Sequence, residues 1–322
     1  MTAPISFADV ERARDRIAPF IAPTPLRTYP ALDQALGLTL FVKHENMQPT
    51  GSFKVRNGLS TVTALTEAQR QVGIIGATTG NHGLGLAYAG KHLGAPVTIC
   101  VPAGNNPEKN AALRAMGATV VEDGKDYDES VGNSLHLAAE RGLTLCHSTN
   151  SVHVLAGAGT MTLEILDQVS DLDVLIIAVG GGSQAVGAIT VAREKHPALR
   201  VIGVGAAGAP THYQSWHAKA PVTGLGSNTF AEGVATRSTY ELTFAALLDG
   251  LSDFVAVTEA EIAEAVRLIL STTHHLVEGA GAMGVAAATK LARQLHGKRV
   301  GVVFCGANMA TETLRRILNR EL

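Results

Sequence analysis

The chain has 322 residues, 46% of them hydrophobic and 17% charged, which is enough for two domains with large buried cores and argues against disorder. A net charge of -2 without a basic stripe makes nucleic acid and anionic membrane surfaces poor candidate partners. Three widely separated cysteines, an N-terminus without the pattern of a secretory signal, and no apolar run long enough to span a bilayer together predict a cytoplasmic protein.

Strand-like and helix-like segments alternate along most of the chain. Short β-branched runs predict strands at 72–77, 96–101, 174–179, 200–204 and 299–304, and helices are expected at 81–93, 108–116, 126–141 and 258–271. This alternation is typical of parallel sheets covered by helices, and the weak polar–apolar alternation within several runs indicates strands buried on both faces. The segment 205–232 is rich in Gly, Ala, Pro and His, and we expect it to be a long connection near a site.

Residues 44–54 form the first segment that points to chemistry. A proline and a glycine in it predict a turn, and Ser52 is a good N-cap for a helix that begins at Phe53. Lys54 then lies in the first helical turn, where the helix dipole disfavours a cation and lowers the pKa of the amine. Imine formation with an aldehyde requires such a lysine, although a solvated surface lysine explains the same residues.

Residues 77–83 form the second such segment, between a predicted strand and a predicted helix. The hydroxyls of Thr78 and Thr79, together with free backbone N–H groups at the start of the helix, make an anion site suited to a carboxylate. An ordinary capped turn is an equally good explanation of these residues.

A run of three glycines, Gly180 to Gly182, follows the predicted strand at 174–179 and is followed by Ser183. Consecutive glycines let the backbone wrap a phosphate, and the next helix points its positive end at it. The run does not match the Walker motif, and no convincing acid follows it about 20 residues later as in a dinucleotide fingerprint. A lone phosphate therefore fits better than a dinucleotide, with a nicotinamide-dependent oxidoreductase as the alternative from another class.

Cys305 comes at the end of the predicted strand at 299–304, at the edge where open α/β sheets bind ligands. A buried structural cysteine is the ordinary alternative. The pair His274 and His275 is expected late in a helix and lacks ligand spacing with any other Cys, His or Asp cluster. We therefore expect no metal site.

Taken together and in this order, these segments resemble the fold-type II pyridoxal-phosphate enzymes, and among them the serine/threonine dehydratase and serine racemase group. The resemblance extends from about Thr24 to the C-terminus. Its markers are Pro49-Thr50-Gly51-Ser52-Phe53-Lys54, Gly80-Asn81-His82, Gly157-Ala158-Gly159-Thr160, the glycine run and Ala231-Glu232-Gly233. It implies an α/β fold of two parallel-sheet domains, with the tryptophan-synthase-beta-like architecture and pyridoxal 5'-phosphate in the cleft between them. The large domain is expected over residues 1–66 and 151–322, and the small domain over 67–150.

The resemblance also implies roles for the matching residues. Lys54 holds the cofactor as an imine and moves the α-proton, and Thr79 takes the place of the serine that acts as the second acid/base in racemase-like members. The implied cofactor-binding residues are Phe53, Lys54, Asn81, Gly180, Gly181, Gly182, Ser183, Gln184 and Cys305. The implied substrate-binding residues are Thr78, Thr79, Gly80 and His82. Cys305 faces the pyridine nitrogen without holding it protonated, which favours rapid loss of a β-leaving group.

Three departures from the family pattern put its familiar substrates, serine and threonine, in doubt. Gly205 stands where the family's divalent-metal site has a glutamate, the usual Lys-x-Arg-Gly-Ala reads Lys54-Val55-Arg56-Asn57-Gly58, and the usual proline after His147 is Ser148. The leading prediction is an ammonia-lyase that converts a β-hydroxy amino acid of the threonine or serine type to a 2-oxo acid and ammonia. The alternatives are a dehydratase of phenylserine or hydroxyaspartate, an amino-acid racemase, and a catalytically silent carrier of the cofactor. We expect a homodimer.

Overall fold

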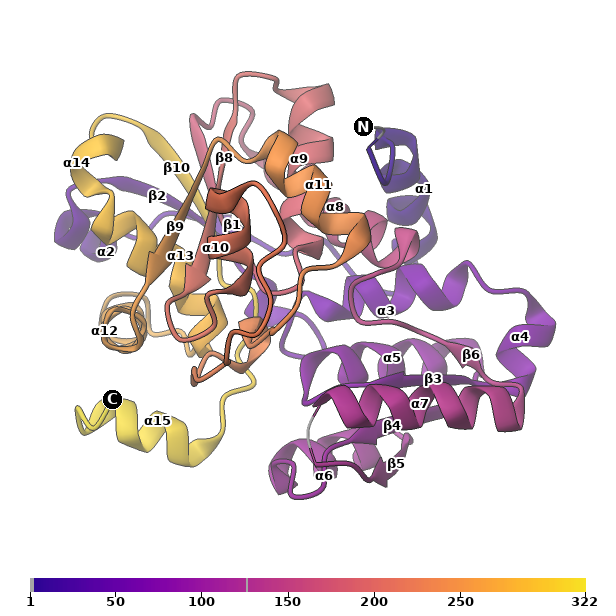
Figure 1. Ribbon diagram of the computed structural model, residues 1–322. Coiled ribbons are helices and arrows are strands. Elements are labelled where there is room, and N and C mark those ends of the chain that lie inside the picture. Colours follow the sequence, from indigo (N-terminus) through magenta and orange to yellow (C-terminus); the bar gives the residue numbers. More distant parts are fainter. Residues whose placement is uncertain (1–2, 126) are drawn as a thin grey trace.

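The computed structural model describes residues 3–125 and 127–322, and they form two sheets covered by helices (Figure 1). The larger sheet has the strand order β1-β2-β10-β7-β8-β9, in which only β1 is antiparallel to its neighbour. Its strands are β1 (Leu26–Arg27), β2 (Thr39–Lys43), β7 (Val174–Ala178), β8 (Arg200–Ala206), β9 (Asp253–Val257) and β10 (Arg299–Val303). The α/β fold with parallel sheets that the sequence predicted is confirmed.

The smaller sheet has four parallel strands in the order β5-β4-β3-β6. They are β3 (Ile74–Ala77), β4 (Val97–Val101), β5 (Thr119–Glu122) and β6 (Thr144–Leu145). These strands all lie between residues 67 and 150, but the core beneath them also contains Ile17, Val55 and Leu59 from outside that range. The domain boundaries therefore stay a prediction, because segments on both sides of residue 67 share this core.

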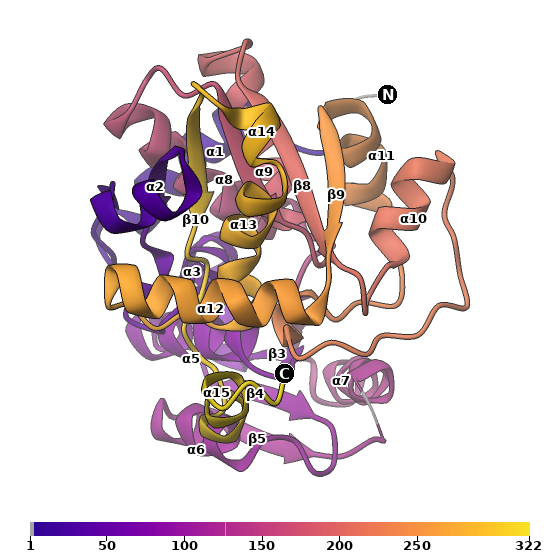
Figure 2. The ribbon, with the colours of Figure 1, turned by 90° about the vertical axis from the view of Figure 1, so that its left-hand side faces the viewer.

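Helices cover both faces of the larger sheet. The helices of the described residues are α1 (Phe7–Ile17), α2 (Pro30–Leu36), α3 (Lys54–Thr63), α4 (Glu67–Val72), α5 (Asn81–Leu93), α6 (Pro107–Ala115), α7 (Tyr127–Arg141), α8 (Val152–Gln168), α9 (Ser183–Lys195), α10 (Thr211–Ala218), α11 (Glu241–Gly250), α12 (Glu259–Thr273), α13 (Gly279–Lys290), α14 (Ala292–Leu295) and α15 (Thr311–Leu318), with short 3₁₀ turns η1 (Glu45–Met47) and η2 (Glu232–Val234). Helices α12 and α13 lie in front of the sheet in Figure 2, and α8 and α9 lie behind it. None of these helices is long and apolar enough to cross a membrane.

Helix α3, which begins at Lys54, is held between helices of the two sheets by close backbone contacts. A Cβ added to Gly58 would lie 2.2 Å from the carbonyl oxygen of Gly85 in α5. A Cβ added to Gly157 in α8 would lie 2.7 Å from the carbonyl oxygen of Arg56 in α3. Only glycine permits such close approach, so these positions fix α3 against α5 on one side and α8 on the other.

A buried charge network also fixes the start of α3. The Arg56 side chain, which is 0% exposed, donates to Glu45 at 2.8 Å and to Glu164 at 2.7 Å. Lys43, also 0% exposed, donates to Glu164 at 2.8 Å. Buried charges persist only when they are paired, so this network ties α3 to the end of β2 and to α8.

Two expectations about this fold are wrong. The segment 205–232 is not one long connection, because β8 continues to Ala206 and α10 (Thr211–Ala218) follows. Tyr213 and Trp216 of this helix pack against the hydrophobic core, although the segment shows no clear helical period. The pair His274–His275 lies beyond α12 rather than within it, since the helix ends at Thr273 and His274 adopts a left-handed φ of 59°.

Candidate active site

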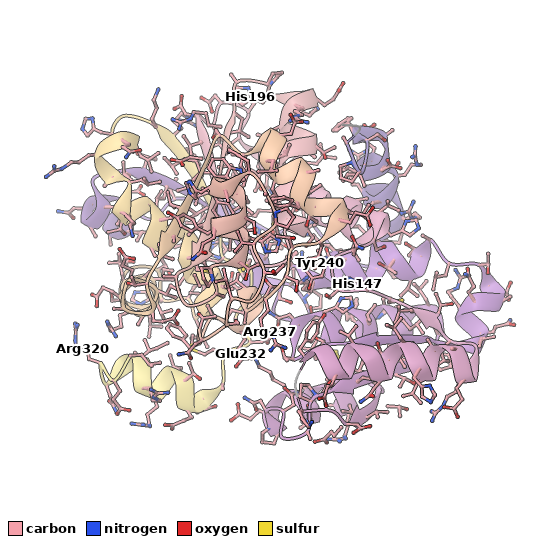
Figure 3. All side chains as sticks on the ribbon, in the orientation of Figure 1. His147, His196, Glu232, Arg237, Tyr240 and Arg320 are labelled. Atoms are coloured by element: carbon pink, nitrogen blue, oxygen red, sulfur yellow. The ribbon has the colours of Figure 1, made fainter. Side chains whose placement is uncertain are left out.

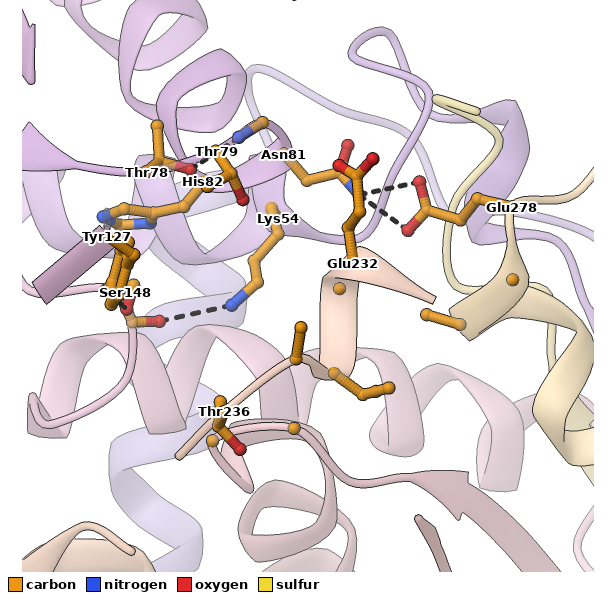
Figure 4. Close-up of a pocket in the computed structure, with 18 of the residues that line it drawn as sticks. Lys54, Thr78, Thr79, Asn81, His82, Tyr127, Ser148, Glu232, Thr236 and Glu278 are labelled. Atoms are coloured by element: carbon orange, nitrogen blue, oxygen red, sulfur yellow. Dashed lines mark hydrogen bonds between the residues drawn. The ribbon is translucent and has the colours of Figure 1, made fainter. Parts of the chain in front are cut away.

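One cavity of about 630 Å³ receives residues from the loops that follow strands of both sheets (Figure 4). Every residue predicted to be catalytic, to bind cofactor or to bind substrate lines this cavity: Phe53, Lys54, Thr78, Thr79, Gly80, Asn81, His82, Gly180, Gly181, Gly182, Ser183, Gln184 and Cys305. The structure thus brings together segments separated by up to 252 positions (53 to 305). The roles of these residues remain predictions.

Lys54 projects into the cavity from the first position of α3. Its Nζ donates to the carbonyl oxygen of Ser148 at 3.2 Å and lies 5.1 Å from the centroid of the Phe53 ring. Burial lowers the pKa of the Lys54 amine to about 8, and the nearby Cys305 and Glu278 oppose that shift. Burial is therefore the main cause of the lowered pKa. Near pH 8, half of the amine is the neutral nucleophile that imine chemistry needs.

The predicted N-cap at Ser52 is wrong. Phe53 is the N-cap of α3, and the buried Ser52 hydroxyl has no hydrogen-bond partner. The reason is that the backbone of Ser52 pairs with Gly306, and the Phe53 N–H donates to the Cys305 carbonyl at 3.0 Å. These bonds hold the chain against the end of β10 until the helix begins.

The turn between β3 and α5 presents polar groups to the cavity. The Thr78 hydroxyl accepts a hydrogen bond from the Gly80 N–H at 2.9 Å. His82 is buried, and burial with the nearby Lys54 lowers its pKa to about 3, so the ring is neutral. Because His82 Nε2 must donate to the Cys146 carbonyl at 3.0 Å, its Nδ1 carries no proton. An anion at this turn would therefore be bound by hydroxyls and backbone N–H groups rather than by an imidazolium.

Asn81 at the start of α5 has both ends of its amide hydrogen-bonded to neighbours. Its Nδ2 donates to both carboxylate oxygens of Glu278, at 2.8 and 3.0 Å (Figure 4). Its Oδ1 accepts from Asn308 Nδ2 at 2.7 Å. The sequence reasoning missed Glu278 and Asn308, although an acid directly before the small-residue run Gly279-Ala280-Gly281 was an available signal.

The turn between β7 and α9 consists of glycines, so it presents backbone rather than side chains to the cavity. Gly182 adopts a φ of 97°, which side chains rarely tolerate. A Cβ added to Gly181 would lie 2.2 Å from the Thr149 hydroxyl, and one added to Gly180 would lie 2.7 Å from the Gly233 carbonyl. The turn leads into α9 at Ser183, where the first N–H groups of the helix lack helical partners. This is a cradle suited to a phosphate.

Cys305 follows β10 and lines the cavity. Burial raises the pKa of its thiol, and the nearby Glu278 raises it further, so the thiol is neutral. The nearby Gln184 side chain opposes this shift, and Gln184 Oε1 is buried without a hydrogen-bond partner. A neutral thiol at this position fits an unprotonated ring nitrogen. With the Lys54 amine and the phosphate cradle, the cavity has the groups that pyridoxal phosphate requires.

Several other cavity residues were not anticipated from the sequence. Lys109 of α6 forms an ion pair with Glu232, which joins the smaller sheet's helices to η2. Tyr127 Oη lies 3.0 Å from Ser148 Oγ beside Lys54. Arg237, on the loop before α11 (Figure 3), also lines the cavity. Within the described ranges 3–125 and 127–322, no group of three or more His, Cys, Asp or Glu side chains is placed to hold a metal ion.

Comparison with known proteins identifies the family. A family model described as pyridoxal-phosphate dependent enzyme matches residues 17–306. The chain belongs to this family. An L-threonine ammonia-lyase from Thermotoga maritima is 33% identical over 319 residues, which cover 99% of this chain and 79% of that relative.

Two further similarities place the enzyme within the family. An L-threo-3-hydroxyaspartate ammonia-lyase from a Pseudomonas species is 33% identical over 313 residues, which cover 97% of this chain and 98% of the relative. The structure of maize serine racemase has a TM-score of 0.93 at 27% identity and covers 99% of this chain and 98% of its own. The enzyme is thus a member of the serine/threonine dehydratase and serine racemase group, as its motifs predicted, and its cofactor is pyridoxal 5'-phosphate.

Proposed function

We propose that the enzyme is an ammonia-lyase that removes water and ammonia from a β-hydroxy amino acid of the threonine or serine type and releases a 2-oxo acid. The observation that carries the proposal is the placement of a lysine with a lowered pKa and a neutral thiol in one cavity with the glycine turn. The relative from Thermotoga maritima, an L-threonine ammonia-lyase, supports this choice of reaction. A homodimer in the cytoplasm is part of the same proposal.

In this proposal each group of residues has a separate role. When bound, pyridoxal phosphate supplies an electron-withdrawing ring that stabilises negative charge at the substrate α-carbon. The glycine turn and Ser183 would hold its phosphate, and the turn at Thr78 would bind the substrate carboxylate. The Lys54 amine takes the α-proton, which its lowered pKa permits near neutral pH. Cys305 would face the ring nitrogen as a neutral thiol that does not hold it protonated, which would favour elimination over transamination.

A dicarboxylic β-hydroxy amino acid is the second candidate substrate. Arg237 lines the cavity, and a guanidinium pairs with a carboxylate through two parallel hydrogen bonds. Tyr127 and Ser148 add hydroxyl groups to the wall beside Lys54. One relative is an L-threo-3-hydroxyaspartate ammonia-lyase, and its substrate carries such a second carboxylate. Hydroxyaspartate is therefore the alternative that the cavity favours over phenylserine.

The test is release of 2-oxo acid and ammonia by the purified enzyme from L-threonine, L-serine, L-threo-3-hydroxyaspartate and phenylserine. We expect keto-acid release from at least one of them, and none from the Lys54→Ala variant. Interconversion of enantiomers without keto acid would instead indicate a racemase. Failure with every substrate, despite bound cofactor, would support a silent carrier and contradict the proposal.

The choice between substrates is tested with Arg237→Leu. If hydroxyaspartate is the substrate, this change should lower kcat/KM for it about 10- to 100-fold more than for threonine, the cost of one charge-assisted pair. Arg293→Leu, at an exposed position of α14, is the matched control for loss of a positive charge. Equal losses on both substrates in Arg237→Leu would favour the threonine or serine type.

A further inference from the structure

Glu278 is a carboxylate in the cavity wall to which the proposed reaction gives no task. It is 9% exposed, it precedes α13 as the N-cap residue, and its backbone N–H donates to the Gly306 carbonyl at 2.9 Å. Burial raises the pKa of this carboxyl group, while the Asn81 amide and Lys109 oppose the shift and Glu232 adds to it. Burying a carboxyl group costs free energy unless hydrogen bonds to its neighbours compensate for the lost hydration.

The hydrogen bonds of Glu278 determine the orientation of Asn81. The Asn81 amide could in principle present either its oxygen or its nitrogen to the cavity. Glu278 accepts from Nδ2, and Asn308 donates to Oδ1 at 2.7 Å, so only one orientation satisfies both neighbours.

Asn308 is itself fixed, which makes the arrangement rigid. Its Nδ2 donates to the Thr50 carbonyl at 2.8 Å and to Asn81, and these bonds use both of its amide hydrogens. A Cβ on Gly51 would lie 2.7 Å from Asn308 Oδ1, so the turn before Lys54 also packs against this side chain. The chain Thr50–Asn308–Asn81–Glu278 therefore links the loops after β2, β3 and β10.

One hydrogen of Asn81 is not needed by this chain. Its amide nitrogen has two hydrogens, and the two oxygens of Glu278, which belong to one carboxylate, need only one of them in a bifurcated bond. Asn81 lines the cavity. Because Glu278 and Asn308 fix the plane of its amide, the direction of its second N–H is fixed as well. A carboxylate acceptor also polarises the amide and strengthens its remaining donor.

We propose that Glu278 and Asn308 are positioning residues that lock the Asn81 amide so that its remaining N–H donates to an oxygen of the bound cofactor. This inference rests on the proposed function only in that the cavity holds pyridoxal phosphate. The role is indirect, because Glu278 and Asn308 act through Asn81. The charged groups that face Glu278 are Lys54, Lys109 and Glu232, and the cavity wall also includes the neutral thiol of Cys305.

The experiment compares the holoenzyme with Asn81→Ala, Glu278→Ala, Glu278→Gln and Asn308→Ala. The readouts are the visible absorption spectrum of the bound cofactor between pH 6 and 10, and its dissociation constant. Asn81→Ala should shift the spectrum and its pH titration and weaken cofactor binding ~10-fold, the factor expected for one hydrogen bond. Glu278→Ala and Asn308→Ala should change both readouts in the same direction. Glu278→Gln, which keeps an acceptor oxygen but loses the charge, should have a smaller effect.

Two comparisons distinguish positioning from general damage. Glu232→Gln removes a carboxylate from the same cavity that pairs with Lys109 instead of Asn81, and it should shift the spectrum less than Glu278→Gln does. The double variant Asn81→Ala/Glu278→Ala should match Asn81→Ala alone, because a positioning residue has no effect once its target is gone. Additive effects, or an unshifted spectrum in both Glu278 variants, would overturn the inference. If wild type binds no pyridoxal phosphate, the proposed function fails first, so the two failures are distinguishable.

Discussion

The turn between β3 and α5 and the turn between β7 and α9 are built on the same plan but bind by different means. Each follows a buried parallel strand and leads into a helix of 13 residues. The first presents the side chains of Thr78, Asn81 and His82 to the cavity, whereas the second presents mostly the backbone of its glycines. One strand–turn–helix unit therefore makes either a site defined by particular side chains or a cradle defined by the absence of side chains.

Their glycines show the same difference. Gly80 has a φ of 175° and a ψ of -103°, and a Cβ there would meet the flexible side chain of Lys109 at 3.4 Å. A Cβ on Gly181 would lie within 3.0 Å of three Thr149 side-chain atoms, and Gly182 has a φ of 97°. The turn after β7 thus leaves no space for a side chain at position 181, whereas a side chain at position 80 would meet a flexible neighbour.

Lys54→Ala should have the largest effect, because both turns serve a ligand that, in our proposal, is bonded to this amine. We expect complete loss of the absorbance of the lysine-bound cofactor and of keto-acid release, with an unchanged far-ultraviolet circular dichroism spectrum. Mass spectrometry of the wild type after borohydride reduction should place the cofactor on Lys54. A label on Lys109, another lysine that lines the cavity, would contradict the assignment.

Gly181→Ala tests the backbone cradle directly, with Gly80→Ala as its matched control in the other turn. The new methyl group at 181 would overpack against Thr149, so the cofactor dissociation constant should rise about 10- to 100-fold. At position 80 the rise should stay below about threefold, because the Lys109 side chain can move aside. Adding Thr149→Gly to Gly181→Ala should restore part of the affinity. Equal losses in the two alanine variants would mean that the turns do not differ as described.

Much of this comparison was visible in the sequence, because local signals define both turns. The helix predicted at 81–93 has those bounds in the structure, and the glycine run directly precedes α9. Glu278 and Asn308 were not predictable in this way, because their contacts to Asn81 join positions 197 and 227 residues apart. The Ser52 cap failed for a related reason: a pairing with Gly306, distant in sequence, overrode the local preference.

Two substitutions test the role of the Cys305 thiol, which lines the same cavity as the glycine turn. Cys305→Ser should retain substantial lyase activity, because a hydroxyl is also a neutral partner for a ring nitrogen. Cys305→Asp should lower kcat at least about tenfold, because a charged carboxylate would hold that nitrogen protonated and slow elimination relative to other outcomes. Steady-state keto-acid release at saturating cofactor measures both. An Asp variant as active as wild type would show that the neutral thiol is not needed.

The region after β8 was predicted to lack a metal site, and that expectation stays a prediction. Gly205 lies near the end of this strand, and a Cβ there would meet the Phe254 ring at 3.4 Å rather than other oxygen ligands. A replacement carboxylate would have to come from an acid distant in sequence, such as Glu232. Glu232 instead lines the cavity and pairs with Lys109.

Chelation should therefore have the smallest effect of these tests. It tests whether the enzyme is active and stable without a divalent ion. A hard cation such as magnesium or calcium needs several oxygen ligands, usually with at least one carboxylate, and the stretch 206–211 contains no acid. We expect exhaustive chelation to leave keto-acid release and melting temperature unchanged, because neither the amine nor the phosphate cradle depends on a cation. Each ion is then restored separately as a control. A large loss with chelator that magnesium or calcium reverses would show that a cation supports the site through carboxylates from another part of the chain.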